Sequence, residues 1–344
     1  MPILSRGGSP VMRHLLCCLP LLLGFLLPPS PSHAGERIRV ALEESGFALT
    51  PLHLAVALGT FEAQGLSVER INTQGRGLAA KALEGGQADF AFVSGDALLT
   101  APPGRPLLVV YSGLSRPIVN WVLRTEAARR RGVDAGSPLR QKLWALRGLT
   151  VGVAAPGGLA ERLARYVASR EGWRIGEEMK LATLGSGPGW LAALREGRAD
   201  AALSGVPFPE LAVARGDAIS LINHASGEDP DLADFLMGVL AVRAEQAERQ
   251  GDLVRRAIRA LRQAVRWGRE HPPARVAALL QPFLGHADAT ETLEGVKAVL
   301  PALNPHGRVT PRGYAATVRV LEAAGAVSRR LPYEAVVSDE FLRD

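Results

Sequence analysis

Cysteine is nearly absent from this chain of 344 residues. Its two cysteines, Cys17 and Cys18, lie together in an apolar segment near the N-terminus. Once that segment is removed, the chain contains no thiol, which excludes a cysteine nucleophile, a zinc site with cysteine ligands and disulfide chemistry. Residues 35–344 are numerous enough to bury a large core without such links, and they suit two domains better than one.

Several features of enzymes and nucleic-acid-binding proteins are also missing. The sequence has no P-loop and no G-x-S-x-G elbow, and its histidines do not have the spacing of metal ligands. We therefore expect no catalytic residue, no metal, no cofactor and no enzymatic activity. The formal net charge of +6 is mild, and arginine runs such as 129–131 come without interleaved aromatic residues, so we also expect no nucleic-acid partner.

The N-terminal segment has the pattern of a secretory signal peptide. A basic start with Arg6 and Arg13 precedes the uncharged apolar run 15–27, and a stretch rich in proline and serine leads to Ala34, with small residues at the −3 and −1 positions of the cleavage point. The run is about 13 residues, shorter than the roughly 20 that span a bilayer. Cleavage of residues 1–34 is therefore predicted in place of a retained anchor. We expect the mature protein in the periplasm.

One short pattern occurs twice. Residues 82–91 and residues 193–202 both read A-L-x-x-G-x-A-D-x-A, and each follows a glycine-rich turn. The pattern is typical of a helix that ends at a glycine, followed by a tight turn and a buried strand. Asp89 and Asp200 occupy equivalent turn positions, so we interpret them as structural acceptors of backbone N–H groups, not as paired catalytic acids. Two such units predict an α/β protein with two lobes, parallel sheets and a ligand cleft between the lobes.

The order of these segments resembles that of bacterial ABC-transporter substrate-binding proteins. The likeness is to the family that binds nitrate, taurine, alkanesulfonates and thiamine-precursor pyrimidines. Residues 51–69 look like that family's opening helix and second strand, and residues 146–153 look like the entry to its second lobe. Both repeated segments also match. The C-terminal helices that complete the likeness are predicted at 251–268, 273–281, 287–300 and 311–324.

This resemblance implies a type II periplasmic binding protein, in which each lobe is a mostly parallel sheet flanked by helices. Lobe 1 would comprise residues 35–115 together with the C-terminal helices 248–344, and lobe 2 would comprise residues 116–247. The lobes would close on a small-molecule ligand by a hinge. The protein would then deliver that ligand, as a monomer, to a membrane permease driven by a separate ATPase.

The ligand is expected beyond the C-terminal ends of the strands, where helices begin. Glycines there allow close approach, free N–H groups and the helix dipole favour an anion, and short hydroxyls add donors and acceptors. Ser-Gly turns occur in any α/β fold, so each one is also compatible with a purely structural role. The predicted ligand-binding residues are Ser45, Gly46, Phe47, His53, Gln74, Gly75, Arg76, Gly77, Ser94, Gly95, Asp96, Ser112, Gly157, Gly158, Ser186, Gly187, Trp190 and Ser204.

Four of these residues decide the predicted chemistry. Arg76 lies in a glycine-flanked turn, where a guanidinium can pair with a carboxylate, sulfonate or phosphonate. Asp96 is either a helix cap or a partner for an amine or ring N–H. Phe47 and Trp190 either stack on a ring or belong to the core. The sequence therefore leaves open sulfonates, taurine, pyrimidines and aromatic carboxylates as ligands. The alternative functions are a periplasmic ligand-binding partner of a sensor, and an enzyme related to thiamine-pyrimidine synthesis.

Overall fold

The computed structural model describes residues 35–43, 46–73, 75, 77–100, 104, 106–285, 287–327 and 330–342. The predicted signal peptide, residues 1–34, lies outside these ranges. Three predicted ligand-binding residues, Ser45, Gln74 and Arg76, lie outside them as well. Within the ranges, each helix is too short or too polar to span a bilayer.

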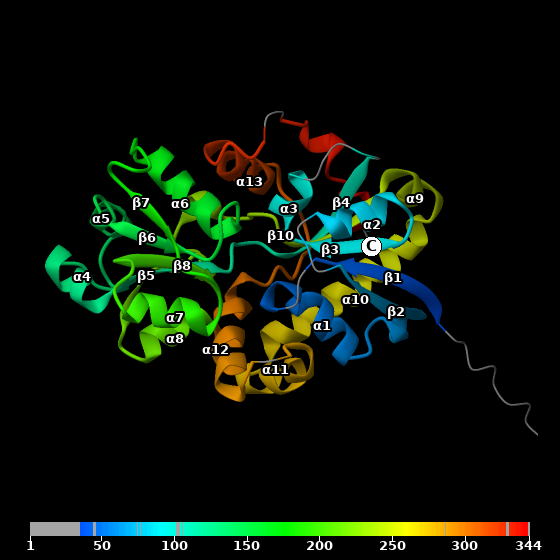
Figure 1. Ribbon diagram of the computed structural model, residues 1–344. Helices are drawn as coiled ribbons and strands as arrows, with labels where there is room; N and C mark the ends of the chain where they lie inside the picture. Colours follow the sequence, from blue (N-terminus) through cyan, green and yellow to red (C-terminus); the bar gives the residue numbers. More distant parts are fainter. Residues whose placement is uncertain are drawn as a thin grey trace, which may run out of the picture. The chain divides into compact units, whose positions relative to one another are not determined.

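The described residues contain two five-stranded sheets (Figure 1). The strands of the first sheet are β1 (Glu36–Leu42), β2 (Leu66–Asn72), β3 (Phe90–Val93), β4 (Leu107–Leu114) and β10 (Met237–Arg243). The strands of the second sheet are β5 (Val119–Arg124), β6 (Thr150–Val153), β7 (Lys180–Thr183), β8 (Ala201–Gly205) and β9 (Ala218–Ile222). The strand orders are β2-β1-β3-β10-β4 and β7-β6-β8-β5-β9. In each sheet a single strand, β10 or β5, is antiparallel to its neighbours, and the other described pairings are parallel, as predicted.

Helices cover both faces of each sheet (Figure 1). The helices of the first half of the chain are α1 (Thr50–Ala57), α2 (Leu78–Glu84), α3 (Gly95–Leu99), α4 (Thr125–Arg131), α5 (Leu139–Ala145), α6 (Leu159–Arg170) and α7 (Pro188–Arg195). The remaining helices are α8 (Phe208–Ala214), α9 (Ala244–Arg249), α10 (Gly251–Glu270), α11 (Pro273–Leu280), α12 (Ala289–Val299) and α13 (Pro311–Ala323). The short 3-10 turns are Phe47–Leu49, Glu62–Gln64, Pro230–Leu232, Gln281–Phe283, Leu300–Ala302, Tyr333–Ala335 and Glu340–Leu342.

Alternation along the strands explains why the sheets are covered on both faces. In β1, Val40 and Leu42 belong to the core that includes residues of α1 and α10, whereas Ala41 belongs to a second core with residues of α2. Successive side chains of a strand point to opposite faces, so the consecutive apolar residues 40–42 of β1 must be buried on both faces of the sheet. Lobe 1 is used below for the first sheet with α1–α3 and α9–α13, and lobe 2 for the second sheet with α4–α8.

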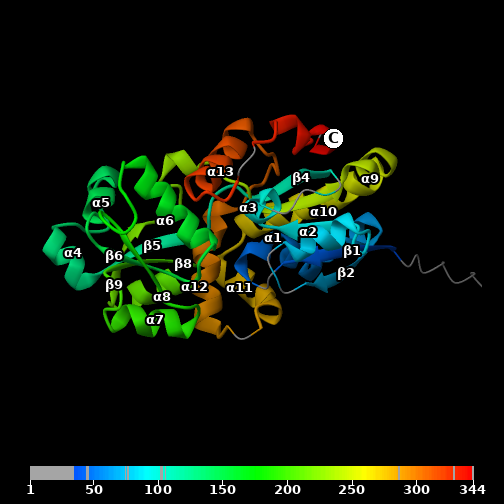
Figure 2. The same cartoon turned by 45° about the horizontal axis from the view of Figure 1, so that its top comes forward.

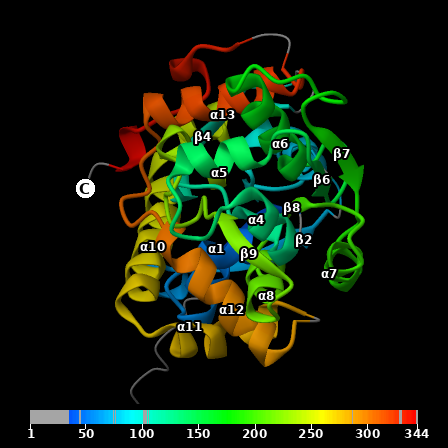
Figure 3. The ribbon, with the colours of Figure 1, turned by 90° about the vertical axis from the view of Figure 1, so that its left-hand side faces the viewer.

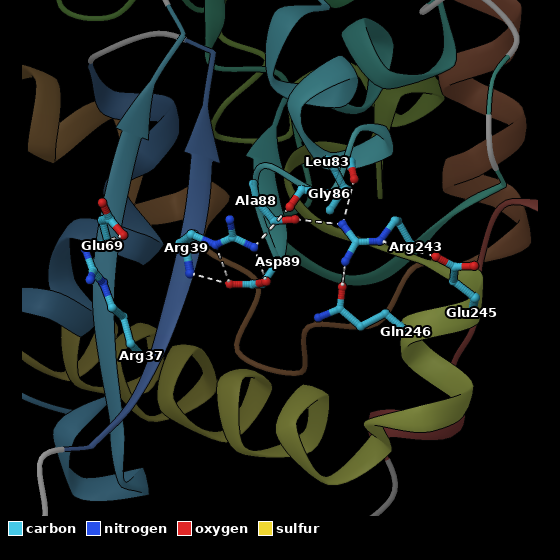
Figure 4. Close-up of polar contacts among 10 residues, drawn as sticks. All are labelled: Arg37, Arg39, Glu69, Leu83, Gly86, Ala88, Asp89, Arg243, Glu245 and Gln246. Carbon is cyan, nitrogen blue, oxygen red and sulfur yellow. Dashed lines mark hydrogen bonds and ion pairs between the residues drawn. The ribbon is translucent and has the colours of Figure 1, made fainter.

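The two copies of the repeated pattern are built alike. Asp89 accepts the backbone N–H of Arg39 at 2.8 Å, and Asp200 accepts the backbone N–H of Thr150 at 3.1 Å. The N–H group of each aspartate in turn donates to the carbonyl of the same partner at 2.9 Å. The side chain of Arg39 pairs with Asp89, and Arg243 at the end of β10 donates to nearby carbonyls (Figure 4). The structural interpretation of both aspartates is confirmed.

Two crossing segments connect the sheets. The first joins β4 to β5 and the second joins β9 to β10. Arg116 in the first crossing donates to the Ala225 carbonyl of the second at 3.4 Å and to the Pro301 carbonyl at 3.1 Å. Because β10 pairs with β3 and β4, the chain has returned to the first sheet by Met237. The predicted lobe 2, residues 116–247, therefore runs past the point at which the chain re-enters the first sheet.

The C-terminal helices contact lobe 2 in two places. Helix α13 packs against α6, and α12 packs against α8 (Figures 2 and 3). Helix α12 begins at a capping box, in which Asp288 accepts the N–H groups of Thr290 and Glu291, each at 2.8 Å. These helices hold lobe 1 against lobe 2 on both sides of the crossing segments.

Candidate ligand-binding cleft

A cleft of about 750 Å³ lies between the lobes. From lobe 1 it is lined by the segment after β1, by the end of β3 and by the start of α3; from lobe 2 it is lined by the segments after β6 and β8. These are C-terminal ends of parallel strands, where α/β proteins bind their ligands. The volume lies within the range of roughly 300–1,000 Å³ that is usual for small-molecule sites.

The polar side chains of the cleft come from both lobes and from α12. Among the residues that the structure describes, they are Glu43, Ser94, Asp96, Ser186 and Glu291. The apolar side chains form most of the wall, and the larger ones are Phe47, Leu49, Phe92, Ile118, Val119, Leu159, Val206, Phe208, Met237 and Leu284.

Asp96 and Arg162 form an ion pair across the lobes. Asp96 is the second residue of α3, lines the cleft and is 1% exposed. Arg162 of α6 donates to Asp96 Oδ2 at 2.8 Å, and its side chain is 8% exposed. Ser94 also donates its hydroxyl hydrogen bond to Asp96. The carboxylate thus receives donors from both lobes, which fixes the lobes relative to each other at the wall of the cleft.

Gly77, the residue before α2, is linked to the same cleft. Gly77 N–H donates to Glu43 Oε1 at 2.5 Å, and Glu43 lines the cleft. Gly77 has φ +75°, a left-handed conformation in which glycine carries no steric penalty, and it precedes the first residue of α2. The start of α2 is therefore held at the rim through Glu43.

The structure brings six of the described predicted residues to the cleft and leaves nine away from it. Those that line it are Gly46, Phe47, Ser94, Asp96, Gly158 and Ser186. Those that do not line it are His53, Gly75, Gly77, Gly95, Ser112, Gly157, Gly187, Trp190 and Ser204.

The predicted residues that miss the cleft are used for packing or for local hydrogen bonds. Trp190 is completely buried in a core of lobe 2 with residues of α8. Ser112 donates to the Leu114 carbonyl at 2.8 Å, and Ser204 is buried within β8. A Cβ on Gly95 would lie 2.4 Å from the Cβ of Leu236, so this glycine allows α3 to approach the chain before β10. For these positions the expected ligand contact is corrected to a structural role.

His53 is likewise a core residue. Its ring stacks on Phe283 with centroids 4.9 Å apart, and it is 2% exposed. Burial, with a smaller contribution from the nearby Arg70 charge, lowers the pKa of His53 to about 4. The imidazole is therefore neutral at pH 7 and packs as an aromatic ring.

Arg162, which pairs with the cleft residue Asp96, was not predicted from the sequence, and neither were the lining residues Glu43, Glu291 and Phe208. Arg162 follows Leu159 by three residues and precedes Leu163, so a helix places it on the same face as these apolar side chains. A charged residue on the apolar face of a helix requires a buried partner. The sequence therefore indicates that Arg162 has a buried partner. It does not indicate that this partner is Asp96, because the two residues come from different lobes.

Solved structures with this fold include solute-binding proteins. The alkanesulfonate-binding protein SsuA from Xanthomonas axonopodis pv. citri, bound to MOPS, has a TM-score of 0.62 at 17% identity, with 89% of this chain and 100% of that chain covered. The periplasmic nitrate-binding protein NrtA from Synechocystis PCC 6803 has a TM-score of 0.56 at 14% identity, with 89% and 92% covered. At these identities the likeness shows the fold alone, and it confirms the predicted two-lobed α/β architecture. No curated protein matches the sequence.

The prediction of no enzymatic activity, which was made from the missing catalytic motifs, is wrong as a general conclusion, because a structural neighbour is an enzyme. The desulfurization enzyme DSZB has the same fold, with a TM-score of 0.57 at 19% identity over 89% of this chain and 97% of that chain. This architecture therefore serves catalysis as well as binding.

The sequence match extends over most of the chain. Residues 47–280 match the NMT1-like family, a range that includes both repeated segments and the lining residues from Phe47 to Met237. The resemblance to the nitrate- and sulfonate-binding family is confirmed. The chain belongs to the NMT1-like family.

Proposed function

We propose that the protein is the extracytoplasmic solute-binding component of an ABC importer. The observation that carries this proposal is the interlobe cleft, whose walls come from strand ends of both lobes. A ligand in that position touches both lobes at once and therefore stabilises the closed arrangement over an open one.

The two crossing segments supply the hinge of this proposal. They are the described connections between the sheets, and Arg116 ties one to the other. Lobe 1 would comprise residues 35–115 with the C-terminal helices, and lobe 2 the residues between the crossings. Gly46, Phe47, Ser94, Asp96, Gly158 and Ser186 would contact the ligand from the described residues, and Ser45, Gln74 and Arg76 remain predicted contacts.

The partners follow from the same proposal. Residues 1–34 would direct export to the periplasm and be removed there. The mature monomer would deliver its ligand to a membrane permease driven by a separate ATPase. The candidate ligands are small polar or anionic organic molecules of the sulfonate, taurine, pyrimidine or aromatic carboxylate class. The shared fold of the alkanesulfonate-binding protein SsuA and the nitrate-binding protein NrtA supports a small polar or anionic solute.

The test is to express the full chain, purify the exported protein under native conditions and measure its mass with and without denaturation. We expect a small organic molecule bound one to one and released on unfolding. Ala155→Trp should abolish it, because Ala155 lines the cleft and an indole would occupy the space. Ala135→Trp is the matched control, since Ala135 is exposed elsewhere on lobe 2. Retention of the molecule by Ala155→Trp, or failure of the cleft to take up any small molecule, would contradict the proposal.

A further inference from the structure

Trp144 is the most exposed of the large hydrophobic side chains that the structure describes. It is the sixth residue of α5 and is 49% exposed, whereas Leu143 and Ala145 beside it are buried. Its ring meets the edge of the buried Trp173, with centroids 6.4 Å apart and planes at 78°. A lone exposed apolar residue is normal in a folded protein, so the side chains near Trp144 decide its meaning.

Three arginine side chains accompany the indole. Arg140 and Arg147 stand four residues before and three residues after Trp144, spacings that place side chains on one face of a helical turn. Arg147 lies over the indole, with its Cζ 5.3 Å from the ring centroid. Arg131, the last residue of α4, donates to the Arg147 carbonyl at 2.9 Å. All three arginines are exposed, and with Trp144 they are called the Trp144 patch below.

The positive charge of the Trp144 patch is not cancelled by ion pairs. No salt bridge between described residues involves its three arginines. Glu178, which feels the charge of Arg147, pairs with Arg174 at 3.9 Å and accepts the N–H of Arg174 at 2.9 Å. Lys142, the other cation of α5, is buried and pairs with Glu228. The patch therefore presents charges of one sign beside an aromatic ring.

The patch lies at the end of lobe 2 that is remote from lobe 1. Helices α4 and α5 stand at this outer end in Figures 1 and 2, and they face the viewer in Figure 3. Their main contacts are with β5 and β9 of their own sheet. Opening or closure of the cleft therefore leaves the patch accessible.

We propose that the Trp144 patch binds the surface of an anionic lipid bilayer. Tryptophan is enriched at the membrane–water interface, where its indole lies at the level of the headgroups. Arginine near such a surface is attracted to the anionic lipids and pairs with their phosphates. A free phosphate or an acidic peptide would satisfy the arginines and leave the indole in water, whereas a bilayer takes up both. Membrane binding of this kind would be independent of the ligand in the cleft.

Vesicles of two compositions test the proposal. The exported protein is titrated with vesicles of phosphatidylcholine alone and with vesicles in which about one-third of the lipid is phosphatidylglycerol. The partition coefficient should be at least about tenfold higher for the anionic vesicles, and it should fall as salt screens the exposed charges. Brominated lipid should quench part of the tryptophan fluorescence. That quenching should disappear in Trp144→Phe, because the other four tryptophans are buried or half-buried.

Variants of the chain separate the patch from the general charge of the protein. Arg140→Ser and Arg147→Ser should each lower the partition coefficient for anionic vesicles about fivefold, the equivalent of about 1 kcal/mol for one basic residue at such a surface. Trp144→Ala should lower it several-fold for both kinds of vesicle. Arg266→Ser is the matched control and should leave it unchanged, because Arg266 is an exposed arginine of α10 in lobe 1. Circular dichroism melting curves establish that each variant is folded.

Equal binding to the two kinds of vesicle, or binding to neither, would overturn the proposal. So would binding to anionic vesicles that Trp144→Ala and Arg140→Ser leave unchanged, or that Arg266→Ser weakens as strongly. Polyglutamate and glycerol 1-phosphate are tested beside the vesicles by calorimetry. Binding of either that requires the patch, without binding to vesicles, would assign the patch to an acidic protein or to a free phosphate. None of these results changes the molecule released on unfolding or its loss in Ala155→Trp, so solute binding in the cleft is tested separately.

Discussion

Replacing Arg162 by methionine is expected to open the cleft without unfolding the protein. The substitution removes the guanidinium that pairs with Asp96 at 2.8 Å and keeps a long apolar stem in α6. Asp96, at 1% exposed, would then be a carboxylate buried without its cross-lobe partner. Separation of the lobes would return that carboxylate to water, so the penalty falls on the closed arrangement.

The size of the effect follows from the burial of both partners. Removing one partner of a buried ion pair costs about 3–5 kcal/mol. At 1.4 kcal/mol per factor of ten, this corresponds to a shift of the closed-to-open ratio by roughly 150- to 4,000-fold. The apparent dissociation constant of a ligand that needs the closed form rises by up to the same factor.

The assay is single-molecule fluorescence transfer between labels on Ala63→Cys in lobe 1 and Arg198→Cys in lobe 2, both of which are exposed positions. Replacing Cys17 and Cys18 by serine leaves these as the reactive thiols of the chain. The Arg162→Met protein should populate a second, more separated state, and its far-ultraviolet spectrum should remain that of the unaltered protein.

Two controls make the reasoning refutable. Arg165→Met removes a neighbouring guanidinium of α6 that pairs with Glu161 inside lobe 2, and it should leave the distance distribution unchanged. The double variant Asp96→Asn with Arg162→Met also removes the charge of the buried carboxylate and should restore much of the closed state. A closed population within twofold of the unaltered protein in Arg162→Met would show that the ion pair does not hold the lobes together.

Further predictions concern stability and the shape of the cleft. Trp190→Ala should lower the free energy of unfolding by about 3–5 kcal/mol in urea titrations, because it empties a fully buried site; a loss below 1 kcal/mol would contradict its core role. The pKa of His53 is lowered to about 4 by burial and by Arg70, so the unfolded chain binds the extra proton first as pH falls from 6.5. Stability should therefore decline between pH 6.5 and 4, by up to about 3 kcal/mol from this residue, and the decline should be shallower in His53→Leu. Gly295→Ala would place a Cβ 2.1 Å from Cζ of Phe47, so the phenyl ring must shift in the cleft. Overpacking of this kind costs about 1–3 kcal/mol, and calorimetry should therefore show ligand affinity reduced about tenfold. Unchanged affinity would show that Phe47 adapts freely.

The sequence predicted the architecture well because local signals repeat in it. The two A-L-x-x-G-x-A-D segments fold as equivalent units, in which Asp89 and Asp200 hold the backbone of Arg39 and Thr150. Helices α10 to α13 lie where apolar periodicity predicts them. Such features depend on residues close in the chain or on one neighbouring strand.

The cleft was harder to predict because its wall depends on distant packing. Ser-Gly turns identify the ends of strands, but they do not show which side chains a neighbouring helix covers. Ser112 donates a hydrogen bond to a carbonyl of its own strand, and Trp190 packs in the core with residues of α8. Both residues nevertheless lie in segments whose sequence resembles ligand-binding turns. The pairing of Arg162 with Asp96 joins residues 66 positions apart from different lobes. Only the arrangement of the lobes brings them together.

The most direct test of the account is hydrogen exchange of the exported protein with and without the molecule released on unfolding. We predict simultaneous protection of cleft segments from both lobes, at 46–49 and 92–97 in lobe 1 and at 154–160 and 205–208 in lobe 2. Protection confined to one lobe, or located away from these four segments, would contradict binding between the lobes.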